Sequence, residues 1–141
     1  MSVEAAGPGA LLFRRGLAAY ADRRFFEAHE EWEQLWAGAI GADRRFLHAL
    51  IQLAAASLHL EAGRRRPAGR LLRAAREKLQ AVPELHWGLD LAPLRAGVAE
   101  AERLLLEDAP VLAFRAVLSL DGLESELGAQ LAPVPDSSPS R

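Results

Sequence analysis

The chain has 141 residues, a net charge of −2 and no cysteine, and half of its residues are hydrophobic. This length fits one domain with a core of ordinary size. The lack of cysteine excludes disulfides, thiolate zinc sites and cysteine nucleophiles. The small net charge argues against nucleic acid or an anionic membrane as a partner.

The N-terminal residues, MSVEAAGPGALLFRRG, have no basic region ahead of an apolar stretch, so they do not resemble a signal peptide. No apolar run is long enough to cross a bilayer. We therefore expect a cytoplasmic protein that makes no membrane contact, and a homo-oligomer remains open. Residues 1–8 are expected to form a loose leader.

Apolar residues at helical spacing, separated by turn residues, predict an all-α protein of about five helices. Asp43 and Asp90 are the expected N-caps of the third and fifth helices. No alternating strand pattern is present, and the short connections favour an antiparallel helical bundle. The predicted helices cover residues 9–22, 25–37, 43–62, 67–81 and 90–108.

The predicted helical domain spans residues 9–108. Residues 109–141 form a C-terminal extension with two weak helical patterns, around 113–118 and 123–127. The end of this extension, PVPDSSPSR, has the composition of a disordered tail.

The stretch from Phe25 to Trp36, FFEAHEEWEQLW, combines aromatic rings with one histidine and several carboxylates. Residues three and four apart share one face of a helix, so His29, Glu33 and Trp36 line one strip. One histidine and one carboxylate then lie beside large apolar rings that must face a core. This strip is the candidate functional site.

The third predicted helix is apolar on nearly every side, as is typical of a central, buried helix. It nevertheless carries one polar stripe, formed by His48, Gln52 and His59. If the second and third helices form an antiparallel hairpin, their polar stripes face each other. This register places His29 beside Gln52, Glu33 near His48, and His59 towards the start of the second helix.

Two interpretations of this polar cluster remain open. In the first, His29 and Glu33 are metal ligands, and His48 or His59 completes the site. Imidazole and carboxylate ligands suit zinc, iron or manganese, and helical bundles build metal sites from facing helices. In the second, the cluster is a structural hydrogen-bond network that sets the helix register, and the protein is a non-enzymatic interaction module.

Familiar catalytic motifs are absent from the sequence. The string HEEWE is not HExxH, because Glu33 stands where the second histidine would be. No serine lies in a nucleophile elbow, and no glycine pattern matches a phosphate loop. Whether the protein is an enzyme stays open. With a metal bound, a water of lowered pKa would be the reactive group.

Four arginines repeat at helical spacing on the fourth predicted helix: Arg66, Arg70, Arg73 and Arg76. They could form a patch for phosphate, RNA or an acidic partner. A solvated helix face is the favoured interpretation, because the net charge is slightly negative.

Two strings resemble the bacterial and archaeal domain-of-unknown-function family 309. The first is H-x-x-x-E-x-x-W, which reads His29, Glu33 and Trp36 here and follows the letters FEA. The second is LIQLA followed by HL, within residues 50–60. The resemblance covers residues 12–79. It implies a small all-α protein of five helices with a functional motif suspected of binding metal, and it supplies no reaction.

The sequence thus predicts a helical protein with a divalent metal ion (zinc, iron or manganese) on its second and third helices. The predicted ligands are His29, Glu33 and His59. The residues expected to support this site are Glu30, Trp36, Gln52 and His48.

Overall fold

The computed structural model describes residues 8–123, and it confirms the all-α class. Residues 1–7 of the predicted leader, the tail and all but the first residue of the second weak helix lie outside this range, whereas Pro8 is the first residue of α1. The described helices are α1 (Pro8–Ala21), α2 (Phe25–Gly38), α3 (Gly41–Glu61), α4 (Arg65–Gln80), α5 (Ala92–Leu106) and α6 (Val111–Val117), and a hairpin of β1 (Leu85–His86) and β2 (Leu89–Asp90) joins α4 to α5.

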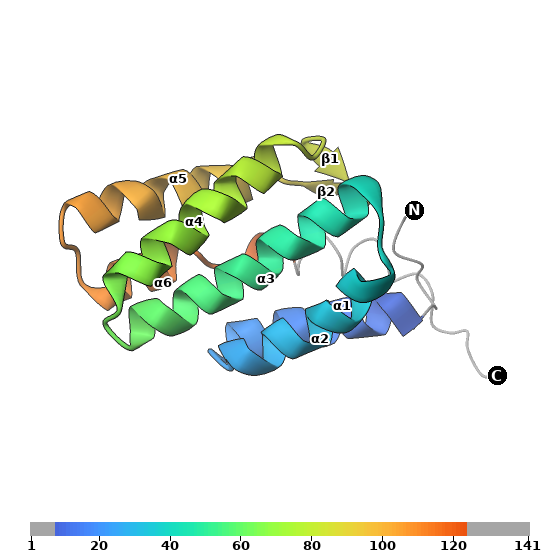
Figure 1. Cartoon of the computed structure of the whole chain (residues 1–141), viewed down its shortest axis with the longest axis horizontal. Coiled ribbons are helices and arrows are strands. Elements are labelled where there is room, and N and C mark those ends of the chain that lie inside the picture. The colour runs from blue at the N-terminus through green and yellow to red at the C-terminus, as the bar shows by residue number, and fades with distance from the viewer. Residues whose placement is uncertain (1–7, 124–141) are drawn as a thin grey trace.

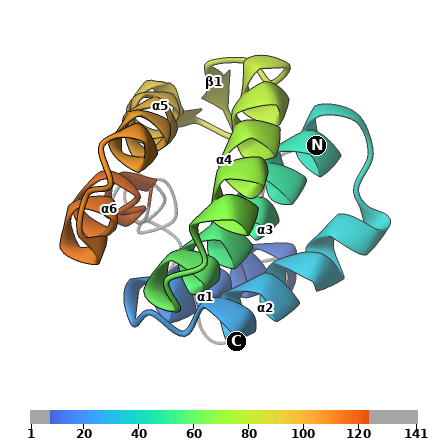
Figure 2. The ribbon, with the colours of Figure 1, turned by 60° about the vertical axis from the view of Figure 1, so that its left-hand side comes forward.

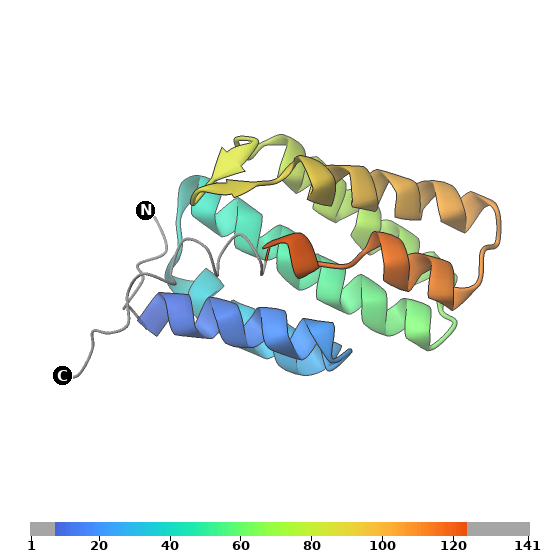
Figure 3. The same cartoon turned by 180° about the vertical axis from the view of Figure 1, so that it is seen from behind.

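The helices form a bundle with α3 at its centre (Figure 1). α2 and α4 pack on α3, α1 packs on α2, and α5 packs on α4. Figure 2 shows the α1–α2 hairpin on one side of α3, with α5 and α6 towards the other side. From behind, α6 crosses the bundle between α1 and α5, where it contacts α3 and α5 (Figure 3).

The position of α3 follows from its residues. Eleven of its side chains are buried, among them Phe46, Leu50 and Leu53, as predicted for a central helix. Ala49, Ala54 and Ala56 on the same helix are completely buried. These small side chains allow neighbouring helices to approach α3 closely, so one helix can serve as the core of the whole bundle.

A tryptophan from α2 holds α1 in place. The Trp32 side chain is fully buried, and its Nε1 donates a hydrogen bond to the Phe13 carbonyl oxygen at 3.2 Å. Gly16 lies directly against the indole ring, where a Cβ atom would overlap it. The lack of a side chain at Gly16 is therefore what lets α1 and α2 pack together.

The α4–α5 connection corrects the prediction that the chain has no strand. Two-residue strands pair antiparallel, with Leu85 opposite Asp90. The turn residues Trp87 and Gly88 have φ values of 56° and 76°, as a two-residue hairpin turn of type I′ requires. The pattern was missed because the strands are short and a tryptophan occupies a turn position that usually holds asparagine or aspartate.

Asp43 also differs from its predicted role. α3 begins at Gly41, and its N-cap residue Ile40 makes no side-chain capping bond. The Asp43 carboxylate lies in the first turn of α3 and is buried, where its Oδ1 accepts a hydrogen bond from Trp87 Nε1 at 2.9 Å. The predicted cap is wrong because Asp43 holds the hairpin instead. The predicted cap at Asp90 is also displaced, because the N-cap of α5 is Leu91; Asp90 lies one residue earlier, where its Oδ1 accepts a hydrogen bond from Ala92 N at 3.0 Å.

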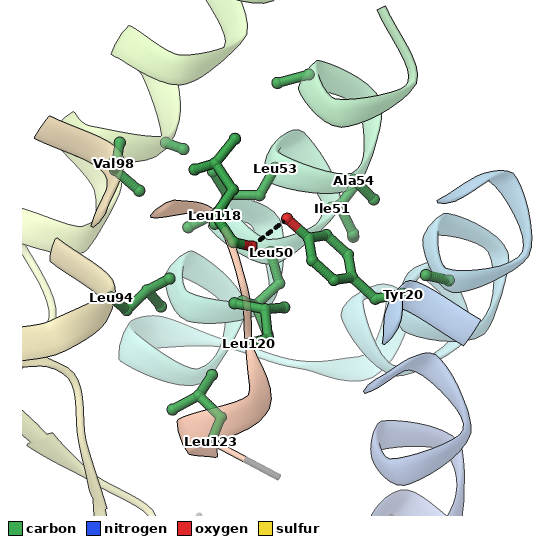
Figure 4. Close-up of a cluster of buried hydrophobic side chains, with 14 of the residues drawn as sticks. Tyr20, Leu50, Ile51, Leu53, Ala54, Leu94, Val98, Leu118, Leu120 and Leu123 are labelled. Atoms are coloured by element: carbon green, nitrogen blue, oxygen red, sulfur yellow. Dashed lines mark hydrogen bonds between the residues drawn. The ribbon is translucent and has the colours of Figure 1, made fainter. Parts of the chain in front are cut away.

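The segment that contains α6 is part of the core. Phe114, Leu118, Leu120 and Leu123 are all buried. The Tyr20 hydroxyl donates a hydrogen bond to the Leu118 carbonyl oxygen at 2.8 Å, which ties α1 to the residue that follows α6 (Figure 4). Within residues 8–123, no helix is long and apolar enough to span a bilayer.

We expect Gly16→Ala to lower the free energy of unfolding by about 1–3 kcal/mol, because the new methyl group must displace the Trp32 indole. Urea unfolding followed by tryptophan fluorescence measures the change. Gly38→Ala is the matched control, since no atom lies within 4 Å of its added Cβ, and it should change stability by less than about 0.5 kcal/mol. Equal stability of the two variants would contradict this account of the α1–α2 packing.

Candidate functional site

His29 and Glu33 lie one turn apart on α2 and face each other. His29 Nε2 is 3.7 Å from Glu33 Oε2, and the two side chains are 28% and 52% exposed. The His29 ring stacks on the ring of Phe26, with centroids 6.2 Å apart and nearly parallel planes. The predicted pair is therefore brought together at the surface of the bundle.

Trp36, the third residue of the motif, joins α2 to α3. The Arg44 guanidinium lies over its ring, 3.7 Å from the centroid. Arg44 Nη1 also donates hydrogen bonds to the carbonyl oxygens of Trp36 (3.1 Å) and Ala39 (3.2 Å) at the end of α2. The Trp36 carbonyl also accepts from Ala39 N at 3.1 Å, so Arg44 adds a second donor at the end of α2, and Trp36 and Arg44 together secure the α2–α3 turn.

His48 of α3 packs on the Trp36 side chain of α2. Its ring centroid lies 5.4 Å from that of Trp36. Burial lowers the pKa of His48 below its usual 6.5, and the charges of Lys78 and Arg44 lower it further. Glu33 acts in the opposite direction and raises this pKa, which places its charge close to His48 as the hairpin register predicted.

His59 and Gln52 occupy the rest of the predicted stripe, and both are partly buried. His59 Nδ1 accepts a hydrogen bond from Arg64 Nε at 3.0 Å. His48 and His59 are eleven residues apart, or roughly 16 Å along the helix axis, so the two histidines cannot serve one site. Across the described part of the chain, no three or more His, Cys, Asp or Glu side chains are grouped so that they could hold a metal ion. The ligand set His29, Glu33 and His59 stays a prediction.

The two glutamates beside His29 have different surroundings. Glu30 is exposed, and it remains beside His29 in sequence without a described contact to it. The Glu31 side chain is only 24% exposed, and its Oε2 lies 3.8 Å from Arg15 Nε. Glu31 is covered because α1 packs along this side of α2.

Three polar atoms along the seam between α2 and α3 are buried and make no hydrogen bond within residues 8–123. They are His29 Nδ1, Trp36 Nε1 and Gln52 Oε1. Buried polar groups are normally paired, so these atoms distinguish the seam from the ordinary core. The predicted structural network is therefore incomplete in this part of the molecule.

A second polar cluster was missed by the sequence analysis. His86 Nε2 lies 3.0 Å from Asp43 Oδ1, the same oxygen that accepts a hydrogen bond from the Trp87 indole. Burial lowers the pKa of His86, although Asp43 opposes this shift. Phe46 packs against both hairpin rings, so this cluster locks the end of the bundle. A histidine and a tryptophan directly before Gly88 were the only local signal.

The arginines of α4 do not act as one set. Arg76 pairs with Glu102 of α5, with Nε 2.6 Å from Oε1. Arg66, Arg70 and Arg73 are exposed and form no ion pair with any residue in the range 8–123. The exposure of these three side chains agrees with the predicted solvated face of this helix.

These observations define a helical domain with one polar strip on α2 and a facing polar stripe on α3. The family model described as "Domain of unknown function (DUF309)" matches residues 13–71. The similarity to this family runs from α1 into α4, and it confirms the resemblance based on His29, Glu33 and Trp36. Comparisons with curated proteins and with solved structures gave no significant match.

We expect stability to fall as the pH drops below 6.5. The pKa of His48 is lower in the folded protein than its ordinary value of 6.5, so the unfolded chain binds more protons in this range. The stabilisation is complete above pH 6.5 and is lost as the pH falls towards the lower folded-state pKa. Urea unfolding between pH 7.5 and 5 should show a steeper loss for the parent than for His48→Gln.

The pKa of His48 can also be followed directly by NMR of its imidazole protons. Lys78→Met should raise it because a nearby positive charge is removed, and Glu33→Gln should lower it because a nearby negative charge is removed. Shifts in the same direction in both variants would contradict the described surroundings of His48.

Proposed function

We propose that this protein is a non-enzymatic helical module that binds a protein partner through the face between α2 and α3. This α2–α3 face is defined by Phe26, His29, Glu33, His48 and Gln52. The observation that carries the proposal is that the three motif residues have different structural roles. Trp36 fastens the helix hairpin, whereas His29 and Glu33 are partly exposed and hold no second element in place.

The chemistry of the α2–α3 face suits a partner that brings both an apolar and a basic side chain. Phe26 is 60% exposed, and exposed aromatic rings are frequent anchors of interfaces. Glu33 beside it offers a carboxylate that forms no ion pair with a described Lys or Arg. The buried polar atoms of His29 and Gln52 give this seam hydrogen-bonding capacity that the described residues leave unused.

A metal site is the second candidate, and the separation of His29 Nε2 from Glu33 Oε2 favours it. At 3.7 Å, these two atoms are close enough to share one divalent ion such as zinc, iron or manganese. His48 of α3, whose pKa is raised by the charge of Glu33, would be the third donor in this candidate. His59 is less suited, because Arg64 occupies its Nδ1. In this candidate the bound ion would supply Lewis-acid chemistry, and Gln52 and Trp36 would border it.

Site-specific crosslinking in living cells tests the interaction proposal. We expect benzoylphenylalanine at position 26 to give an adduct of discrete mass with another protein or a second copy of this chain. Glu33→Arg should reduce this adduct by about tenfold or more, because a basic partner group would then meet a positive charge. The matched control is the same probe at Leu106, which is 88% exposed on the far end of α5 and should not give this adduct.

Two results would contradict the interaction proposal: no discrete adduct at position 26, or the same adduct from position 106. The metal candidate is separated from it by the metal content of untagged protein purified without chelator. Stoichiometric zinc, iron or manganese in the parent and none in a folded His29→Ala variant would support the metal site. Absence of metal from both would remove that candidate.

A further inference from the structure

A pocket of about 190 Å³ lies where the end of α1, the start of α2, the end of α3 and α6 meet. Two of these elements, α1 and α6, lie on the side of α3 that is seen in Figure 3. An apolar cavity of about 150 Å³ can hold benzene, so this pocket has room for roughly six to eight non-hydrogen atoms. Its location is separate from the α2–α3 face, and the inference drawn from it does not depend on the proposed function.

The walls of the pocket are mostly apolar. Phe25, Leu60, Phe114 and Leu118 line it, and all four side chains are buried. Tyr20 also lines it, and its hydroxyl is held by the Leu118 carbonyl oxygen at 2.8 Å (Figure 4) and by Ser57 Oγ at 3.1 Å. Burial raises the pKa of Tyr20 to about 12, so this group is neutral and does not repel an anion.

Two of the charged residues in the pocket neutralise each other. Arg115 of α6 donates from Nε to Glu61 Oε2 at 2.8 Å and from Nη2 to Glu61 Oε1 at 2.7 Å. This bidentate ion pair joins α6 to the end of α3, and its hydrogen bonds lower the pKa of Glu61. Neither group is therefore available as the main binding site for a charged ligand.

Arg23 is the second arginine that lines the pocket, and it is not part of the Glu61–Arg115 pair. It lines the pocket at the turn between α1 and α2, and it forms no ion pair with the other residues of the 8–123 range. Its backbone has φ of 61°, a conformation unusual for a residue other than glycine, so the turn fixes the point from which its side chain leaves the chain. Asp121 also lines the pocket, so a ligand with a single negative charge fits better than a polyanion.

We propose that this pocket binds a small monocarboxylate with a branched aliphatic or aromatic body. The carboxylate binds the Arg23 guanidinium, which presents paired N–H donors that match its geometry. The apolar body lies against Phe25, Leu60 and Phe114. A ligand of about eight non-hydrogen atoms that makes one charged contact would bind with a Kd on the order of 0.1–1 mM.

Titration of the full chain with 4-methylpentanoate, followed by amide chemical shifts, tests the proposal. We expect shifts confined to residues of the pocket, and binding weaker by roughly tenfold in Arg23→Gln because the charge-assisted contact is lost. The neutral probe 4-methylpentanamide should bind the parent about tenfold more weakly than the acid, and Arg23→Gln should not change its affinity. Arg73→Gln, which removes an exposed arginine of α4 distant from the pocket, should bind the acid as the parent does.

Several outcomes would overturn the proposal. One is the absence of pocket shifts with 10 mM 4-methylpentanoate, an excess of about tenfold over the weakest expected Kd. Another is equal affinity for the acid and the amide in the parent protein. A third is an equal loss of acid binding in Arg23→Gln and Arg73→Gln, which would show a general charge effect. Melting temperatures of both variants establish that each is folded, so a lost affinity is not an unfolding effect.

Discussion

The burial of α3 is the constraint on which the rest of the structure depends. This helix is the only described element that contacts α2, α4 and α6. An isolated helix of this length gains little stability from its own hydrogen bonds, so α3 is stabilised mainly by the apolar surface that its neighbours cover. The buried alanines of α3 allow the neighbouring helices to pack closely against it, and every helix hairpin in the bundle is positioned with respect to α3.

The same constraint explains why the polar stripe of α3 is informative. A central helix could have been apolar on all sides, yet His48, Gln52 and His59 form one line along it. All three side chains are partly buried, so this line lies at the seams between α3 and its neighbours rather than in the apolar core. Trp36 and Arg44 close one end of the α2–α3 seam, and the Arg64–His59 hydrogen bond lies at the other end of the stripe. Between them, His29 and Glu33 are partly exposed.

Local patterns predicted most of the fold, because each helix carries its own signal. The observed ends of α1 to α5 lie within two residues of the predicted ones, and the register of α2 against α3 followed from two stripes that could face each other. What the sequence did not reveal depends on contacts between distant residues. Asp43 and Trp87 are separated by 44 positions, and Tyr20 and Leu118 by 98. The roles of these residues become apparent only when the bundle brings them together, and the same is true of the pocket beside Arg23.

The two candidate binding regions differ in how the fold supports them. The α2–α3 face belongs to helices joined by a short turn that Trp36 and Arg44 secure, so its side chains have a fixed spacing before any partner binds. The pocket is formed partly by α6, a helix of seven residues held by Phe114, the Glu61–Arg115 pair and the Tyr20 hydroxyl. Short segments with few anchors open more readily than central helices. A ligand in the pocket would therefore stabilise the docking of α6 on the bundle, whereas binding at the α2–α3 face would act on a surface that is already rigid.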